Sequence, residues 1–155
     1  MEHYRRAISL LEKWGRLDRL QSPQTSDTID LLEVALQVKL PPSYRAMLQD
    51  FGILIYRGGE IIYGIGLNGV KGEGGSGVWF QTEVARARGQ ISQTMVCIMS
   101  SGYGPEFCIE CAERQPNGES PVYLVPAAGY PVGLEKVADS FGEFLLKEVE
   151  LSLDD

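Results

Sequence analysis

One segment predicts the centre of the fold: Leu40-Pro41-Pro42-Ser43-Tyr44-Arg45-Ala46-Met47-Leu48-Gln49-Asp50-Phe51-Gly52. The proline pair ends one helix and begins another, because proline lacks the N–H group that the first turn leaves without a partner. Ser43 can satisfy N–H groups of that first turn, and Gly52 suits the left-handed residue after a helix. One apolar stripe at the 3.6-residue period marks the second helix: Tyr44, Met47, Leu48 and Phe51.

Patterns on either side of this segment extend the prediction. Helical periodicity covers residues 4–20, 27–40 and 78–88, and a closing helix is expected from Val137 onward, with Asp139 and Ser140 as caps at its start. Strands are predicted over residues 52–56, 60–65, 94–99, 106–111 and 121–125. Short turns join neighbouring strands, which favours antiparallel pairing. The expected class is α+β, in a single domain over 1–155 with an N-terminal helix and loop (1–26) before its core (27–150).

Bulk composition is that of a folded protein without a membrane anchor. The chain has 155 residues, 44% of them hydrophobic, which is enough for a sizeable core. No apolar run reaches the ~20 residues of a membrane helix, and the N-terminus does not read as a secretory signal. Three cysteines, an odd number, are interpreted as reduced thiols. We therefore expect a cytoplasmic protein with no membrane contact.

Acidic residues are spread unevenly along the chain. The net charge is −7, yet residues 1–26 carry a net +2 and residues 103–155 a net −8. A chain this acidic is poorly suited to bind a phosphate backbone, so no direct contact with nucleic acid is expected. Two interpretations of the acidic excess stay open. It is an ordinary solvated surface, or it is a negative face that steers a basic protein partner.

Three motifs that resemble chemical sites fail on their context. Gly64–Gly69 matches G-x-G-x-x-G, but further glycines up to Gly77 follow where a phosphate-binding helix should open, so a surface loop is predicted instead. Cys108 and Cys111 would face opposite sides of a strand, which disfavours a metal or redox pair. His3 is the sole histidine, which leaves no catalytic triad. We expect no enzyme activity, no cofactor and no metal site, with Cys97 and Cys108 packed as neighbours across a hairpin.

Two motifs at opposite ends of the chain resemble one family. Residues 40–44, Leu-Pro-Pro-Ser-Tyr, followed by Leu48 and Phe51-Gly52, are similar to the LP-x-x-Y/F step of the SUKH superfamily, the Smi/Knr-like domains. Residues 137–145, Val-Ala-Asp-Ser-Phe-Gly-Glu-Phe-Leu, are similar to the family's closing helix. The chain departs from the family at Phe51-Gly52-Ile53, where members often have N-G-G, and in its glycine-rich loop at 64–77.

The resemblance carries expectations about architecture and function. It implies a mainly antiparallel or mixed sheet of about six strands, wrapped by the N-terminal helices, one inserted helix and a C-terminal helix. It also implies a bacterial immunity protein that binds and neutralises a cognate toxin, with a basic nuclease domain as the expected partner. The alternative is a general interaction module of the same fold without a toxin partner. No contact residue transfers from the family, and the oligomeric state, monomer or dimer, stays open.

Carboxylates and an aromatic residue in the strand region are the candidates for contact with the toxin. Aromatic side chains anchor protein interfaces, and charges set their specificity. The predicted toxin-binding residues are Glu60, Glu73, Tyr103, Glu106, Glu110 and Glu113.

Overall fold

The computed structural model describes residues 1–18, 20–57, 59–72, 74–128 and 133–154. These residues contain five helices and six strands. The helices are α1 (Glu2–Lys13), α2 (Ser26–Leu36), α3 (Pro42–Asp50), α4 (Val78–Ala87) and α5 (Phe141–Leu153). The strands are β1 (Leu54–Tyr56), β2 (Glu60–Ile62), β3 (Met95–Ser100), β4 (Glu106–Glu110), β5 (Val122–Val125) and β6 (Glu135–Ala138). The predicted α+β class is confirmed.

The strands form two antiparallel sheets. β1 pairs with β2, and a four-stranded sheet follows in the order β3-β4-β5-β6, so each strand lies beside its neighbour in sequence. The Tyr63 N–H donates to the Ile98 carbonyl at 2.8 Å and ties the hairpin to β3. The expected six strands are therefore present but divided between two sheets. Short connections explain the antiparallel order.

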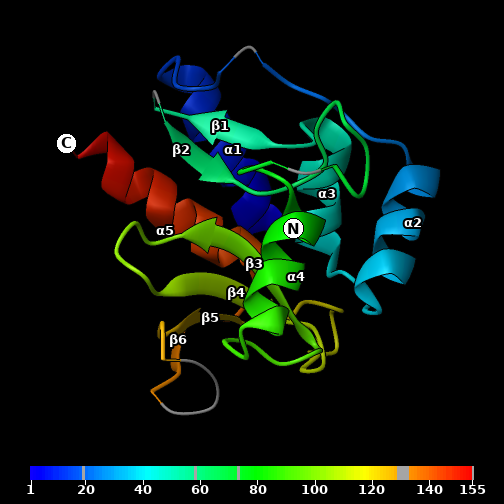
Figure 1. Ribbon diagram of the computed structural model, residues 1–155. Coiled ribbons are helices and arrows are strands. Elements are labelled where there is room, and N and C mark those ends of the chain that lie inside the picture. The colour runs from blue at the N-terminus through cyan, green and yellow to red at the C-terminus, as the bar shows by residue number, and fades with distance from the viewer. Residues whose placement is uncertain (19, 58, 73, 129–132, 155) are drawn as a thin grey trace.

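Helices cover the sheets (Figure 1), and helices and strands both contribute buried hydrophobic residues to the core. α1 packs along α5, and Phe107 of β4 meets Phe144 of α5 with ring centroids 4.9 Å apart. α4 packs against β3. Cys97 and Cys108 are buried Cα partners of β3 and β4 with free thiols, which confirms their predicted pairing across the hairpin. Within the described residues, none of the helices combines the length and the apolar content that a bilayer-spanning segment needs.

Three predicted helix boundaries were wrong. The first helix ends at Lys13 and not at residue 20, because Gly15 takes a left-handed φ of 63° and Leu17 then bridges to Tyr56. The second ends at Leu36, where Gln37 takes a φ of 59°. Val137 and Ala138, where the closing helix was expected to begin, instead belong to β6 (Glu135–Ala138) at the sheet edge. α5 begins only at Phe141, with Ser140 as its N-cap.

The two motifs that carry the family resemblance meet in the core. The Ser43 hydroxyl donates to Glu119 Oε1 (2.7 Å) and accepts from the Gly142 N–H (3.1 Å), while the Ser43 N–H donates to Glu119 Oε2 (3.1 Å). Tyr44 also contacts Phe141 edge to face, with centroids 5.2 Å apart. Glu119 is thus the buried cap of α3, whose N-cap Pro41 offers no side-chain acceptor. Because the Ser43 hydroxyl accepts the Gly142 N–H, Ser43 also joins α3 to the start of α5.

Gly52 lies where three segments cross. Its φ is 75°, and a Cβ there would stand 2.0 Å from the Ser22 carbonyl oxygen and 2.7 Å from that of Ile65. The Ser22 N–H donates to the Phe51 carbonyl (2.8 Å), and its hydroxyl donates to the Ile65 carbonyl (2.8 Å). Only glycine fits both the backbone angle and the space. This crossing holds the loop before α2 against the start of the glycine-rich segment.

Candidate functional site

One end of the molecule gathers the tip of the β1–β2 hairpin, the C-terminal half of α5 and the β3–β4 turn (Figure 1). Glu60, at the start of β2, and Glu148 of α5 line a hollow of about 160 Å³ there, together with Tyr56, Arg57, Leu151 and Ser152. Leu151 is 63% exposed beside it. We define the hairpin-end surface as Glu60, Glu148 and Leu151. The β3–β4 turn, which carries Tyr103, lies at the same end of the molecule in Figure 1.

The β3–β4 turn presents Tyr103 to solvent. The Ser101 N–H and hydroxyl both donate to the Pro105 carbonyl (3.2 and 2.5 Å), and the Gly102 N–H donates to Ser100 Oγ (3.0 Å). These bonds close the turn, and Tyr103 stands at its tip with 74% of its surface exposed. An exposed aromatic ring on a hydrogen-bonded turn is a suitable anchor for a protein interface.

Glu106 begins β4 directly after this turn and is only partly exposed. Burial raises the pKa of Glu106, against the opposing effects of the Cys97 thiol, which donates to Oε2 at 3.3 Å, and of the Arg88 charge. Burial, and after it the Glu106 charge, raises the pKa of the neighbouring Tyr63 to about 12. Glu106 is therefore a carboxylate that has already lost part of its hydration.

Glu148 is in a similar state. Burial raises its pKa, and the negative charge of Glu60 raises it further. In the described part of the chain, no lysine or arginine forms an ion pair with Glu106 or Glu148. A partly dehydrated carboxylate without an ion-pair partner gains more from an incoming arginine or lysine than a fully hydrated one does.

Of the six predicted site residues, three belong to elements at this end, two lie elsewhere, and one lies outside the described residues. Glu60 lies on the hairpin-end surface, Tyr103 lies in the β3–β4 turn, and Glu106 begins β4 with its side chain against Cys97 on the α4 side of the sheet. Glu110 lies at the other end of β4, is only 8% exposed, and accepts the Ala112 N–H at 3.0 Å, so it presents little surface. Glu113 follows it and accepts the Tyr123 hydroxyl on both oxygens (3.1 and 3.0 Å). Glu73 lies outside the described residues.

The acidic excess of residues 103–155 is not one continuous face. Glu119 is buried against Ser43, Asp139 pairs with Lys136 at 2.6 Å, and Glu143 pairs with Lys147 at 3.0 Å. Several of these carboxylates are therefore already engaged in hydrogen bonds or ion pairs within the protein. The prediction from sequence missed Leu151 and Glu148, although one signal was available: Glu148 falls on the apolar stripe of the closing helix, where a carboxylate is out of place.

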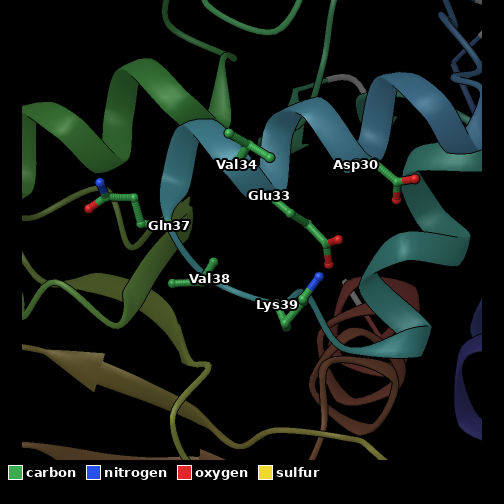
Figure 2. A pocket seen from close by; sticks show the side chains of 6 residues that line it. All are labelled: Asp30, Glu33, Val34, Gln37, Val38 and Lys39. Atoms are coloured by element: carbon green, nitrogen blue, oxygen red, sulfur yellow. The ribbon is translucent and has the colours of Figure 1, made fainter.

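Two further hollows open elsewhere. One of about 570 Å³ follows α2 and is lined by Asp30, Glu33, Val34, Gln37, Val38 and Lys39 (Figure 2). The other, of about 260 Å³, is lined mainly by backbone of the glycine-rich segment. α4 does open after that segment, but its first N–H, that of Val78, donates to the Gly64 carbonyl at 2.9 Å. The described residues contain no group of three or more His, Cys, Asp or Glu side chains able to hold a metal ion.

Comparison with known protein families finds a match over the region that holds both motifs. Residues 23–147 match the SMI1 / KNR4 family (SUKH-1), a range that includes both the proline step at 40–44 and the closing motif at 137–145. No curated protein matches the chain. Because the match covers most of the sequence, the chain belongs to the SMI1 / KNR4 family (SUKH-1).

Proposed function

We propose that this protein is a non-enzymatic immunity protein that binds a cognate toxin in the cytoplasm and blocks its active site. Family membership supports a protein partner, and the hairpin-end surface supports the chemistry of the contact. The observation that carries the proposal is that this end of the molecule holds two partly buried carboxylates near exposed apolar side chains. Glu148 lies beside Leu151 on α5, and Glu106 directly follows the turn that presents Tyr103.

This arrangement fits a basic partner. Tyr103 and Leu151 supply apolar contact area, while Glu106 and Glu148 receive arginine or lysine side chains. A nuclease active site carries such cations because it must hold phosphate, and an acidic protein of net charge −7 is attracted toward it over long range. The immunity protein would cover the site by occupying the place of the nucleic-acid backbone, with no contact to nucleic acid itself.

The test is binding to the product of the adjacent gene, expressed with its catalytic base removed. We expect co-purification and an association rate that falls steeply as salt rises. Glu106→Gln and Glu148→Gln should each weaken binding about tenfold to a hundredfold, and Tyr103→Ala about thirtyfold. Glu135→Gln, on the exposed edge strand β6, is the matched control and should change the affinity less than about twofold.

Two results would contradict parts of the proposal. Tight binding that is insensitive to salt and to both glutamine substitutions would refute the electrostatic mechanism but would still support a toxin as the partner. Absence of binding, together with capture of several unrelated proteins, would favour the general interaction module instead.

A further inference from the structure

A second hollow opens at the same end of the molecule as the hairpin-end surface. It has a volume of about 350 Å³, and we define it as the basic hollow by its lining residues, Gly15, Arg16, Leu17, Asp18 and Arg57. The last of these, Arg57, also lines the hollow that holds Glu60 and Glu148. The basic hollow therefore lies directly beside an acidic one, and the two meet at Arg57.

Backbone hydrogen bonds fix the positions of the two hollows relative to each other. The Asp18 N–H donates to the Ile55 carbonyl at 3.0 Å, and the Arg57 N–H donates to the Arg16 carbonyl at 3.0 Å. Residues 16–18 thus extend the β1–β2 hairpin by a third segment, which Figure 1 shows beside the hairpin after the end of α1. A partner that contacts both hollows is therefore held in one orientation.

Arg16 supplies a charge to the basic hollow. It is partly buried, and in the described part of the chain no carboxylate forms an ion pair with it. Asp18 lines the same hollow, but its Oδ1 accepts the Leu20 N–H at 2.8 Å. The planar guanidinium of arginine binds a carboxylate through two parallel N–H donors. A carboxylate of a partner is therefore the group that fits the basic hollow.

Exposed apolar side chains belong to the segments that form both hollows. Trp14, directly before the basic hollow in the chain, is 56% exposed, and Lys13 Nζ lies 5.5 Å from the centre of its ring. Leu20, shortly after the hollow in the chain, is 75% exposed, and Leu151 is exposed beside the acidic hollow. Tryptophan and arginine are enriched among the residues that dominate binding energy at protein interfaces. This end of the molecule thus combines both signs of charge with apolar contact area.

We propose that the toxin-binding surface is bipolar, an inference that rests on the proposed function. The hairpin-end surface and the basic hollow together bind one face of the toxin, on which an arginine or lysine lies beside an aspartate or glutamate. The toxin cation enters between Glu60 and Glu148, and the toxin carboxylate pairs with Arg16. Opposite charges side by side set the orientation of the complex and reject a uniformly basic partner, which the basic hollow repels. Metal-dependent nucleases combine both charges in one site, since carboxylates hold the metal ion and cations hold the phosphate.

Charge reversal at Arg16 tests the proposal by the sign of its effect. The probe is the adjacent gene's product without its catalytic base, titrated calorimetrically into the full chain at about 0.15 M salt. A uniformly basic toxin face would bind Arg16→Glu more tightly than wild type, whereas a bipolar face should bind it at least about tenfold more weakly. Arg16→Lys keeps the charge and should stay within about fivefold of wild type.

Arg6→Glu, on the exposed side of α1, is the matched control. Both reversals lower the net charge of −7 by two units, because each removes a positive charge and adds a negative one. Arg6→Glu should therefore reproduce any effect of net charge alone, and we expect it to change the affinity less than about twofold. Circular dichroism of each variant confirms that it is folded.

Zero-length cross-linking locates the two contacts. A carbodiimide joins a carboxylate to an amine that touches it, so Arg16→Lys places a reactive amine in the basic hollow. In the complex, we expect position 16 of this variant to link to an aspartate or glutamate of the toxin, as mass spectrometry of the digested product would show. Arg6→Lys should give no such link.

The outcomes separate this inference from the proposed function. If Glu148→Gln weakens toxin binding while Arg16→Glu leaves it unchanged or strengthens it, the bipolar surface is overturned and the proposed function stands. The same holds if position 16 forms no link to the toxin in a complex that Glu148→Gln weakens. Absence of toxin binding by the wild-type chain overturns both.

Discussion

Ser43→Ala should be costly for a change of one oxygen atom, because that atom joins three parts of the chain. The substitution removes the donor to the buried Glu119 carboxylate and leaves the Gly142 N–H without its acceptor. A hydrogen bond to a charged group contributes about 1.5–3 kcal/mol, and an unsatisfied buried N–H costs about 1 kcal/mol more. The expected loss in free energy of unfolding is about 3 kcal/mol. For a domain of this size, it corresponds to a melting temperature lower by about 6–12 °C.

Urea unfolding followed by circular dichroism measures this loss at constant m-value. Ser140→Ala is the matched control: its hydroxyl accepts only the Glu143 N–H at 3.0 Å, as the N-cap of α5, and its loss should cost about 1 kcal/mol. If Ser43→Ala destabilises the protein no more than Ser140→Ala does, the junction of Ser43, Glu119 and Gly142 contributes little, and the reasoning is wrong.

Two further predictions concern a glycine and a carboxylate. Gly52→Ala should lower the free energy of unfolding by more than about 4 kcal/mol, because the added Cβ would overlap the Ser22 and Ile65 carbonyls. The control is Gly15→Ala, which also lies at positive φ but has open space around it, and it should cost about 1–2 kcal/mol in the same urea titration. Glu148→Gln should raise stability at pH 7 by about 0.5 kcal/mol or less after solvent screening. The pKa of Glu148 is raised in the folded state, so its ionised form destabilises the folded protein. The stability gained by the substitution should therefore vanish below the ordinary pKa of 4.5. Melting curves that show equal gains in stability at pH 7 and pH 4 would exclude this explanation.

Local patterns predicted the elements whose signals are complete within a few residues. The proline step and the stripe through Tyr44, Met47 and Leu48 placed α3 to within two residues. The turn residues between β3 and β4 likewise predicted that hairpin and the pairing of Cys97 with Cys108. In both places, spacing and turn chemistry act between near neighbours, which is the information that a single sequence carries.

Features that depend on distant partners could not be predicted in the same way. Val137 and Ala138 fit the helical stripe of α5, yet the pairing of this segment with β5 makes them part of a strand. No local pattern marks Glu119 as a helix cap, because its partner Ser43 lies 76 residues away in the sequence. The same limit applies to the candidate site. Glu60 and Glu148 lie far apart in sequence, and the fold alone brings them to one hollow.

The packing of α1 on α5 bears on how the protein is made. The ribosome synthesises residues 2–13 first, but their partner helix begins at residue 141. At about 5–20 residues per second, the first helix waits on the order of ten seconds with its apolar face uncovered. An isolated helix of 12 residues is marginal in water, so it is not expected to persist during this time. The fold therefore closes only after α5 has been synthesised, and a chain interrupted before α5 would be a substrate for proteases.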